Sequence, residues 1–332
     1  MFNINNPEVK FALDAVRQAA QLVKTVQTET ADNALTKGDK SPVTVADFAS
    51  QALVSRMMMQ QFPDAVLTGE EASDALKEDG AEHLLEAVTS YTARFVPECT
   101  PDSVCEWIDW GAAEPTNRFW TLDPIDGTKG FIRGDQYAVA LALIEDGEVQ
   151  IGVLGCPNLT NGTKSEPGGA GTLMVAVKGQ GTWLTDLVEA EEKDWQRVQV
   201  SPRANGVEAR LMRSFESGHT DVSKIDEIAS ALGVDVDPVR MDSQAKYSVL
   251  AVGGGEVILR LLSPKRLDYK EKIWDQAAGA IVLTEAGGRI SDLDGKPLDF
   301  TQGRMLLNNR GVLATNGALH DAALKALKDV GA

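Results

Sequence analysis

The chain of 332 residues is long enough for about two domains, each of which can bury a core. Hydrophobic residues make up 43% and charged residues 24% of the chain, which excludes a protein that is mainly disordered. The formal net charge of -17 leaves no excess of basic side chains for a polyanion, so DNA and RNA are not expected partners.

The first two predicted elements are helices. Asn6 is in the position of an N-cap, and apolar residues then recur at helical spacing to about residue 28. Thr44 and Asp47 have the spacing of a capping box, which predicts a second helix that ends before Pro63.

The middle of the chain is predicted to contain an insertion and then a sheet. After a short strand at residues 65–67, residues 74–118 fit neither the helical nor the strand period, and we expect a mostly helical lid or insertion there. The turn signal Asp146-Gly147 separates two apolar runs and predicts that they pair antiparallel. Turn-forming residues dominate 157–171, which predicts a loop. The expected strands of this sheet cover residues 119–122, 138–144, 149–155 and 172–177.

Strands and helices alternate after about residue 190, a pattern typical of α/β structure. The expected strands cover residues 211–214, 256–262 and 312–315, and the expected helices cover 222–232, 274–286 and 319–327. Gly287-Gly288 is expected to end the helix before it. We therefore predict an α/β protein with an α+β domain at residues 1–190 and an α/β domain at residues 191–332.

Neither export nor membrane insertion is indicated. The first ten residues lack a basic stretch followed by an apolar one, and no segment approaches roughly 18 uncharged apolar residues. The cysteines form no C-x-x-C pair, and the histidines give no zinc-ligand spacing. We expect a cytoplasmic protein with reduced thiols.

Two aspartates follow directly on an aromatic-rich strand, at the edge of a sheet where ligands usually bind. In the sequence D-P-I-D-G-T at residues 123–128, Asp123 and Asp126 can face one centre, with the carbonyl of Ile125 between them. Mg²⁺ binds carboxylates together with water and phosphate oxygens. The simpler alternative is a turn in which both aspartates only cap backbone amides.

Acidic residues elsewhere in the chain favour the metal hypothesis. Glu70 and Glu71 follow an expected strand, and Asp275 is expected in the first turn of a helix. Simpler explanations exist for some of them, because Asp275 would interact favourably with the helix dipole and Asp47 could be a capping residue only. Their occurrence together favours one shared cation site.

These segments resemble the signatures of the inositol monophosphatase superfamily of magnesium-dependent, lithium-inhibited phosphatases. The resemblance extends from Lys37 to Asn316, and it implies a layered αβαβα sugar-phosphatase-like fold. No family motif matches residues 74–118. The motifs are E-E at residues 70–71, D-P-I-D-G-T at 123–128, W-D-Q-A-A-G at 274–279 and E-A-G-G at 285–288.

Within this superfamily the chain is most similar to the 3′(2′),5′-bisphosphate nucleotidases. The sequence D-S-Q-A-K-Y at residues 242–247 resembles their nucleotide-site motif, and inositol monophosphatases lack its S-Q-A-K-Y segment. Further similar segments are G-D-K-S-P-V-T-V-A-D at residues 38–47, S-G-H-T at 217–220, Arg260, and Y-K-E-K-I-W-D at 269–275.

The resemblance implies two or three Mg²⁺ ions, with inhibition by Li⁺. By resemblance, Glu70, Asp123 and the Ile125 carbonyl hold the first ion, while Asp123, Asp126 and Asp275 hold the second. Asp123 would therefore bridge the two ions.

The resemblance also implies a water-activating pair and a nucleotide site. Asp47 and Thr128 would orient and deprotonate the attacking water, and the N–H groups of Gly127 and Thr128 would hold phosphate oxygens. A solvated lysine and a surface ion pair are the simpler explanations for Lys246 and Arg260. The residues implied to bind the nucleotide are His219, Ser243, Lys246 and Arg260.

The expected function is hydrolysis of the 3′-phosphate of adenosine 3′,5′-bisphosphate, with 3′-phosphoadenylyl sulfate as a further candidate substrate. An inositol phosphatase, or a phosphatase of another small sugar phosphate, is the first alternative, and a non-catalytic nucleotide- or metal-binding regulator is the second. A calcium-binding structural protein is disfavoured, because the EF-hand loop spacing is absent. The expected partner is a small nucleotide bisphosphate, without a membrane or a nucleic-acid polymer, and the expected assembly is a monomer, with a dimer as the alternative.

Overall fold

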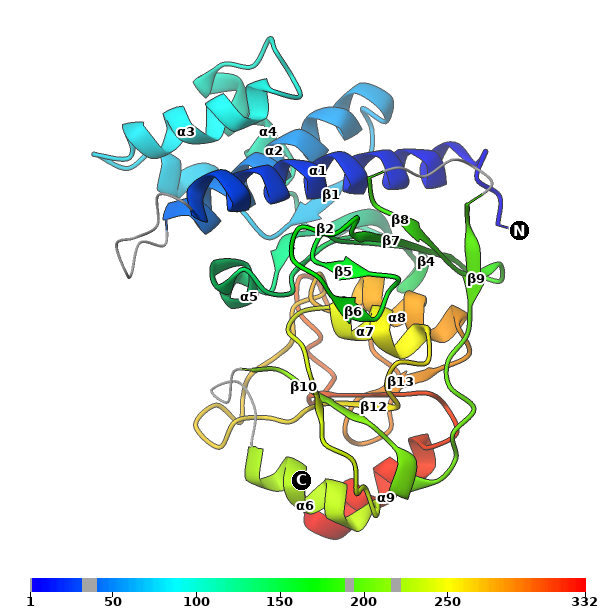
Figure 1. The fold of residues 1–332 in the computed structure, drawn as a ribbon. Helices are drawn as coiled ribbons and strands as arrows, with labels where there is room; N and C mark the ends of the chain where they lie inside the picture. The colour runs from blue at the N-terminus through cyan, green and yellow to red at the C-terminus, as the bar shows by residue number, and fades with distance from the viewer. Residues whose placement is uncertain (1, 32–40, 189–193, 216–221) are drawn as a thin grey trace.

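The computed structural model describes residues 2–31, 41–188, 194–215 and 222–332. These residues form alternating layers of helix, sheet, helix, sheet and helix (Figure 1). The predicted α/β class and layered arrangement are confirmed. No described helix is long and apolar enough to span a membrane.

The first sheet is antiparallel except at one edge, where β1 pairs parallel with β2. Its strand order is β1 (Leu67–Gly69), β2 (Arg118–Asp126), β3 (Ala138–Glu145), β4 (Glu148–Cys156), β7 (Thr172–Val177), β8 (Gly181–Asp186) and β9 (Gln196–Val198). Because β9 belongs to it, this sheet extends past residue 190. The division of the chain into domains at that residue stays a prediction.

Two long helices, α1 (Pro7–Ala31) and α2 (Ser41–Gln61), cover the outer face of the first sheet (Figure 1). The predicted N-cap of α1 is confirmed, because the Asn6 side chain accepts hydrogen bonds from the N–H groups of Glu8 and Val9 at 2.8 and 3.3 Å. The predicted start of α2 at Thr44 is wrong. The helix begins at Ser41, so Thr44 and Asp47 lie inside it.

The second sheet has the strand order β11 (Val239–Arg240), β10 (Leu211–Arg213), β12 (Val257–Arg260), β14 (Val312–Thr315) and β13 (Arg289–Ser291). Its outer face is covered by α6 (Val222–Ala231) and α9 (His320–Val330) (Figure 1). Between the two sheets lie α7 (Ala245–Ala251) and α8 (Ala277–Glu285). Residues 277–283 of α8 are all buried, as expected for a helix with a sheet on either side.

Residues 74–118 are mostly helical, as predicted, with η1 (Ser73–Leu76), α3 (Glu82–Ala93) and α4 (Pro101–Trp110) packed near α2. The loop predicted at 157–171 instead contains a short hairpin of β5 (Leu159–Thr160) and β6 (Lys164–Ser165). Besides β5 and β6, the described elements that the sequence reasoning did not predict are β8, β9, β11, β13, α7 and η2 (Gly206–Glu208).

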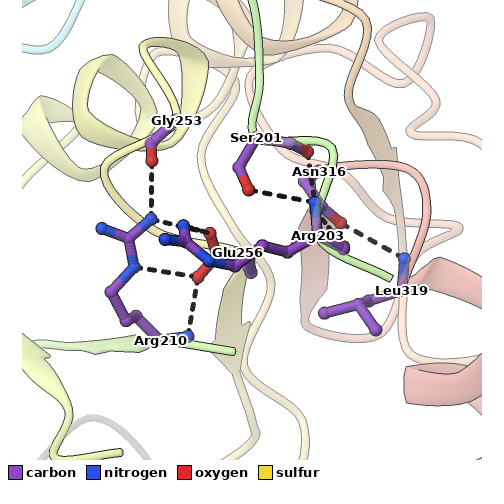
Figure 2. Close-up of polar contacts among 7 residues, drawn as sticks. All are labelled: Ser201, Arg203, Arg210, Gly253, Glu256, Asn316 and Leu319. Carbon is purple, nitrogen blue, oxygen red and sulfur yellow. Dashed lines mark hydrogen bonds and ion pairs between the residues drawn. The ribbon is translucent and has the colours of Figure 1, made fainter. Parts of the chain in front are cut away.

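A buried glutamate attaches the connection between the two sheets to the second sheet (Figure 2). Glu256 is fully buried just before β12, and it accepts hydrogen bonds from Arg203 Nη1 at 3.0 Å and from Arg210 Nη2 at 2.7 Å. The Arg210 backbone N–H donates to its second oxygen at 2.7 Å. Asn316 extends this network by donating to the carbonyl oxygens of Ser201 and Arg203 at 2.9 and 2.7 Å.

We predict that Glu256→Gln lowers the free energy of unfolding at pH 7 by about 3 kcal/mol, because it leaves two arginines without their buried counter-charge. Burial raises the pKa of Glu256, but hydrogen bonds from Arg210, Ser201 and Arg203 outweigh burial and lower it. The stabilisation is therefore fully present above the carboxyl's ordinary pKa, and it is lost progressively as the pH falls from that value through the lowered pKa of the folded state.

Urea denaturation of the wild type and the variant at pH 7 and near pH 3 measures this difference. Glu227→Gln, at an exposed position on α6, is the control and should change stability little. An equal difference at both pH values would contradict a role for the Glu256 charge.

Candidate active site

The parallel pairing of β1 with β2 places two predicted metal ligands side by side. Gly69 is in register with Leu122, so Glu70 and Asp123, the residues that follow them, lie at the same edge of the sheet. The register of β2 against β3 shifts between Asp123 and Asp126. The predicted turn after a strand is therefore the irregular end of β2, where Pro124 has no N–H to donate.

Helix α2 contributes one face to this edge. Asp47, Ser50 and Gln51 are spaced so that they share a face of the helix. The side-chain amide of Gln51 makes two hydrogen bonds with the backbone of Glu71. Its Nε2 donates to the carbonyl at 2.6 Å, and its Oε1 accepts from the N–H at 2.9 Å. Ser50 Oγ donates to the Pro124 carbonyl at 3.4 Å. These contacts hold the buried Asp47 close to Glu70 and Glu71, whose charges act on it.

The second half of the chain brings Asp275 to the same place. Asp275 lies in the turn that precedes α8, not in its first helical turn as predicted. Gln244 connects this segment to the first sheet, because its backbone N–H donates to Asp126 Oδ2 at 2.6 Å and its Nε2 donates to the Trp274 carbonyl at 2.9 Å. Sequence reasoning included Gln244 in a motif but gave it no role.

The carboxylates raise one another's pKa. Burial and then the charges of Glu70, Asp126, Asp275 and Asp47 hold the pKa of Asp123 well above its ordinary value. Burial, with Glu71 and Asp126, raises the pKa of Glu70 to about 7. Burial is also the largest cause of the raised pKa values of Asp47 and Asp275. The structure therefore gathers five of the predicted acidic residues from both halves of the chain.

This acidic cluster fits a divalent cation by its chemistry. Asp123 Oδ1 is buried without a hydrogen-bond partner, and the surrounding carboxylates are oxygen ligands of the kind that Mg²⁺ prefers. In the described residues, no three histidine, cysteine, aspartate or glutamate side chains are already arranged around a metal position. Glu70 is instead hydrogen-bonded to Asp123, and Asp126 to Gln244, so rotation of these side chains would be needed for ligation.

Two cationic side chains, the buried Lys246 and the partly exposed Arg260, lie beside the acidic cluster. Lys246 is only 6% exposed, and its Nζ donates to the Ser243 carbonyl at 2.9 Å and to Ser214 Oγ at 3.3 Å. Burial lowers the pKa of Lys246 to about 8, against the opposing attraction of Asp126. Burial raises the pKa of Asp126, and Lys246 and Arg260 oppose this rise, which places both cations near that carboxylate.

Arg260 is held by a buried carboxylate. Its Nε donates to Glu271 Oε1 at 3.1 Å, and its Nη2 lies 2.8 Å from Glu271 Oε2. Burial lowers the pKa of Arg260, but the charges of Glu271 and Asp275 outweigh burial and raise it. Gln276 also donates to Glu271 at 3.0 Å, so the guanidinium is fixed next to the segment that carries Asp275.

The predicted phosphate-binding turn directly follows Asp126 and lies against the Ser243 loop. Gly127 is the N-cap of α5 (Thr128–Arg133) and has a φ of +96°. A Cβ at Gly127 would lie 2.8 Å from the Cβ of Ser243, so the turn and the Ser243 loop approach each other closely. Ser243 itself has a φ of +66°, which is uncommon for a residue with a side chain.

Thr128 begins α5, which packs against α2, the helix that carries Asp47. The predicted nucleotide ligand His219 lies outside the described residues, as do residues 38–40 of the N-terminal motif. Sequence reasoning missed Lys272 and Arg304, whose cationic groups lie 5.6 and 4.8 Å from the ring centroid of Trp274. Lys272 lies in the Y-K-E-K-I-W-D segment at residues 269–275, but sequence reasoning gave it no role. Arg304 lies in no recognised motif, and only the pairing of two loops brings it there.

Comparisons with known proteins show the family to which the chain belongs. A sequence profile of the inositol monophosphatase family matches residues 5–332. A protein of Oryza sativa named 3′(2′),5′-bisphosphate nucleotidase is 41% identical, over 97% of this chain and 94% of its own length. A protein of the same name from Schizosaccharomyces pombe is 39% identical, over 96% of this chain and 94% of its own length.

Solved structures show the same fold. The inositol monophosphatase of Anabaena (Nostoc) sp. PCC 7120 has a TM-score of 0.61 and 21% identity, with 97% of each chain covered. An inositol monophosphatase of Thermotoga maritima has a TM-score of 0.64 and 18% identity, with 98% of each chain covered.

We predict that Asp123→Asn stabilises the metal-free protein by about 1 kcal/mol, because it removes one buried charge from a cluster of like charges. The same change should abolish any stabilisation by Mg²⁺. Thermal unfolding in chelator and in excess Mg²⁺ measures both effects. Asp321→Asn, at an exposed position on α9, is the control, and a destabilised Asp123→Asn protein in chelator would contradict the prediction.

Proposed function

Because the chain belongs to the inositol monophosphatase family, we propose that it is a magnesium-dependent phosphomonoesterase that converts adenosine 3′,5′-bisphosphate to AMP and phosphate. One observation carries the choice of substrate. Two cations, the buried Lys246 and the partly exposed Arg260, act on Asp126 of the carboxylate cluster. A site with two regions of opposite charge suits a substrate with two phosphates, one held at each region.

The proposed cation site uses side chains from both halves of the chain. Glu70, Asp123 and the Ile125 carbonyl would hold one Mg²⁺, and Asp123, Asp126 and Asp275 would hold a second. Bound Mg²⁺ supplies counter-charge for the phosphoryl oxygens, lowers the pKa of water and makes the reaction sensitive to Li⁺.

Asp47 and Thr128 are the proposed water-activating pair. The Thr128 hydroxyl accepts a proton from the attacking water and passes its own proton to the Asp47 carboxylate. The raised pKa of Asp47, caused by burial and by Glu71 and Glu70, makes this carboxylate a stronger base than an exposed aspartate. The water oxygen then bonds to phosphorus as the bond between phosphorus and the 3′ oxygen breaks, and the 3′ oxygen takes a proton from a solvent water to become the hydroxyl of AMP.

The second phosphate is held by groups that take no part in this step. Lys246 and Arg260 would bind the 5′-phosphate through charge-assisted hydrogen bonds, with the Ser243 hydroxyl as a further donor. The N–H groups of Gly127 and Thr128 would bind oxygens of the reacting phosphate. His219 stays a predicted contact to the nucleotide. A substrate that retained a 5′-phosphate without these contacts would bury part of a dianion uncompensated.

A phosphate-release panel tests the proposal. It compares adenosine 3′,5′-bisphosphate, 3′-phosphoadenylyl sulfate and inositol 1-phosphate, each with Mg²⁺, with Mg²⁺ plus Li⁺, and with excess chelator. We expect the highest kcat/KM with adenosine 3′,5′-bisphosphate, inhibition by Li⁺ and no turnover in chelator. Preference for inositol 1-phosphate would replace the nucleotide assignment with the inositol phosphatase alternative, and full activity in chelator would overturn the metal assignment.

We predict that Lys246→Ala lowers kcat/KM for adenosine 3′,5′-bisphosphate at least tenfold, about 1.4 kcal/mol. Hydrolysis of adenosine 3′-monophosphate, which lacks the 5′-phosphate, should change little. Steady-state kinetics on both substrates separates this specific loss from a general one. An equal loss on both substrates would assign Lys246 to folding or to the metal site.

The charge of Lys246 gives an internal check on the same prediction. With its pKa lowered to about 8 by burial, the wild-type lysine loses its proton as the pH rises through that value, and kcat/KM for the bisphosphate should fall. Lys246→Ala should not show that fall. Lys325→Ala, at an exposed position on α9, serves as the matched control.

A further inference from the structure

The backbone of Arg304 is joined to the segment that carries Asp275. Arg304 lies in the loop between β13 and β14, and its carbonyl accepts from the Ile273 N–H at 3.2 Å. Met305 pairs with Lys272 in an antiparallel bridge, and the Leu306 N–H donates to the Glu271 carbonyl at 2.9 Å. The loop therefore runs alongside residues 271–273, immediately before Trp274 and Asp275.

The side chain of Arg304 reaches the other half of the site. Its Nη2 donates to the carbonyl of Gly69 at 2.6 Å, and Gly69 is the residue before Glu70. Its Nη1 lies 3.4 and 3.5 Å from the carbonyl oxygens of Ala112 and Ala113, in the segment that pairs with β1. One guanidinium thus holds the end of β1 and the strand-like segment beside it.

The same guanidinium packs on Trp274, with its central carbon 4.8 Å from the ring centroid. A planar guanidinium can stack on a ring and donate at its edge at once, which an ammonium cannot do. Arg304 is therefore in contact with the residue that precedes Glu70 and with the residue that precedes Asp275.

We propose that Arg304 is a positioning residue that sets the separation of the Glu70 and Asp275 carboxylates, and through it the affinity of the site for divalent cations. This inference rests on the metal site of the proposed function and does not depend on which phosphate ester is the substrate.

A comparison with Lys272 distinguishes a positioning role of Arg304 from a purely electrostatic effect of its charge on the metal site. Its Nζ lies 5.6 Å from the centroid of the same tryptophan ring, and its charge acts on Glu70. Both cations repel a metal ion in the site, so the loss of either charge alone would tighten cation binding. Only the loss of a positioning contact would weaken it. Arg304→Gln and Lys272→Gln should therefore change the Mg²⁺ affinity in opposite directions.

The experiment titrates Mg²⁺ into the full-length protein by calorimetry, without substrate, and then measures kcat on adenosine 3′,5′-bisphosphate. Arg304→Gln should raise the Kd for Mg²⁺ about tenfold, the scale found when a partner that orients a metal ligand is removed. Arg304→Lys keeps the charge and should weaken binding in the same direction. Lys272→Gln should lower the Kd, and Arg289→Gln, at a surface ion pair with Asp321, should leave it unchanged.

Equal or tighter Mg²⁺ binding by Arg304→Gln would overturn the inference, and so would wild-type affinity in Arg304→Lys. If Arg304→Gln does not fold, as judged by circular dichroism and thermal unfolding, Arg304→Lys decides the question. A wild-type protein that binds Mg²⁺ but does not hydrolyse the nucleotide would refute the proposed substrate and leave this result valid. A wild-type protein that binds no divalent cation would refute both.

Discussion

The burial of several like-charged carboxylates in one place is the constraint on which the rest of this structure depends. Asp123, Asp47 and their neighbours lie where water cannot solvate them fully, and each raises the pKa of the others. Such a cluster disfavours folding unless neighbouring groups hold it together. Gln51 and Gln244 supply part of this support. The Gln51 side chain binds the backbone of Glu71, and the Gln244 side chain binds the carbonyl of Trp274, so both hold the chain segments that carry the carboxylates.

The cationic side of the site follows the same rule. Lys246 is buried and Arg260 is partly exposed, and each is held by oxygen acceptors: Ser243 and Ser214 for the lysine, Glu271 for the arginine. A basic surface patch would attract any polyanion, whereas these two cations are held at fixed positions beside the carboxylates.

Much of this arrangement was predictable from the sequence, because the relevant signals are local. The cap at Asn6, the turn at Asp146-Gly147 and the end of α8 at Gly287-Gly288 each depend on a few adjacent residues, and each was predicted correctly. In the same way, the D-P-I-D-G-T segment indicated Asp123 and Asp126, and the S-Q-A-K-Y segment indicated Lys246.

What the sequence did not reveal depends on contacts between distant segments. The position of Arg304 arises from the pairing of two loops, and the contact of Gln51 with Glu71 depends on how α2 lies against β1. Asp275 was placed in a helical turn because its surroundings are apolar at helical spacing, although the helix starts at Ala277. Edge strands such as β9 have mostly exposed residues, so they carry no alternation that would distinguish them from a loop.

Helix α8 lies between the two sheets, and its buried residues pack in one apolar cluster with side chains of both, among them Ala140 of β3 and Ile258 of β12. Such a helix belongs to both cores at once. If either sheet were removed, one side of α8 would be exposed to water along its whole length, and the favourable transfer of those side chains would be lost. The two halves are therefore expected to unfold in a single cooperative transition, and neither half is suited to independent expression or to exchange with that of another protein.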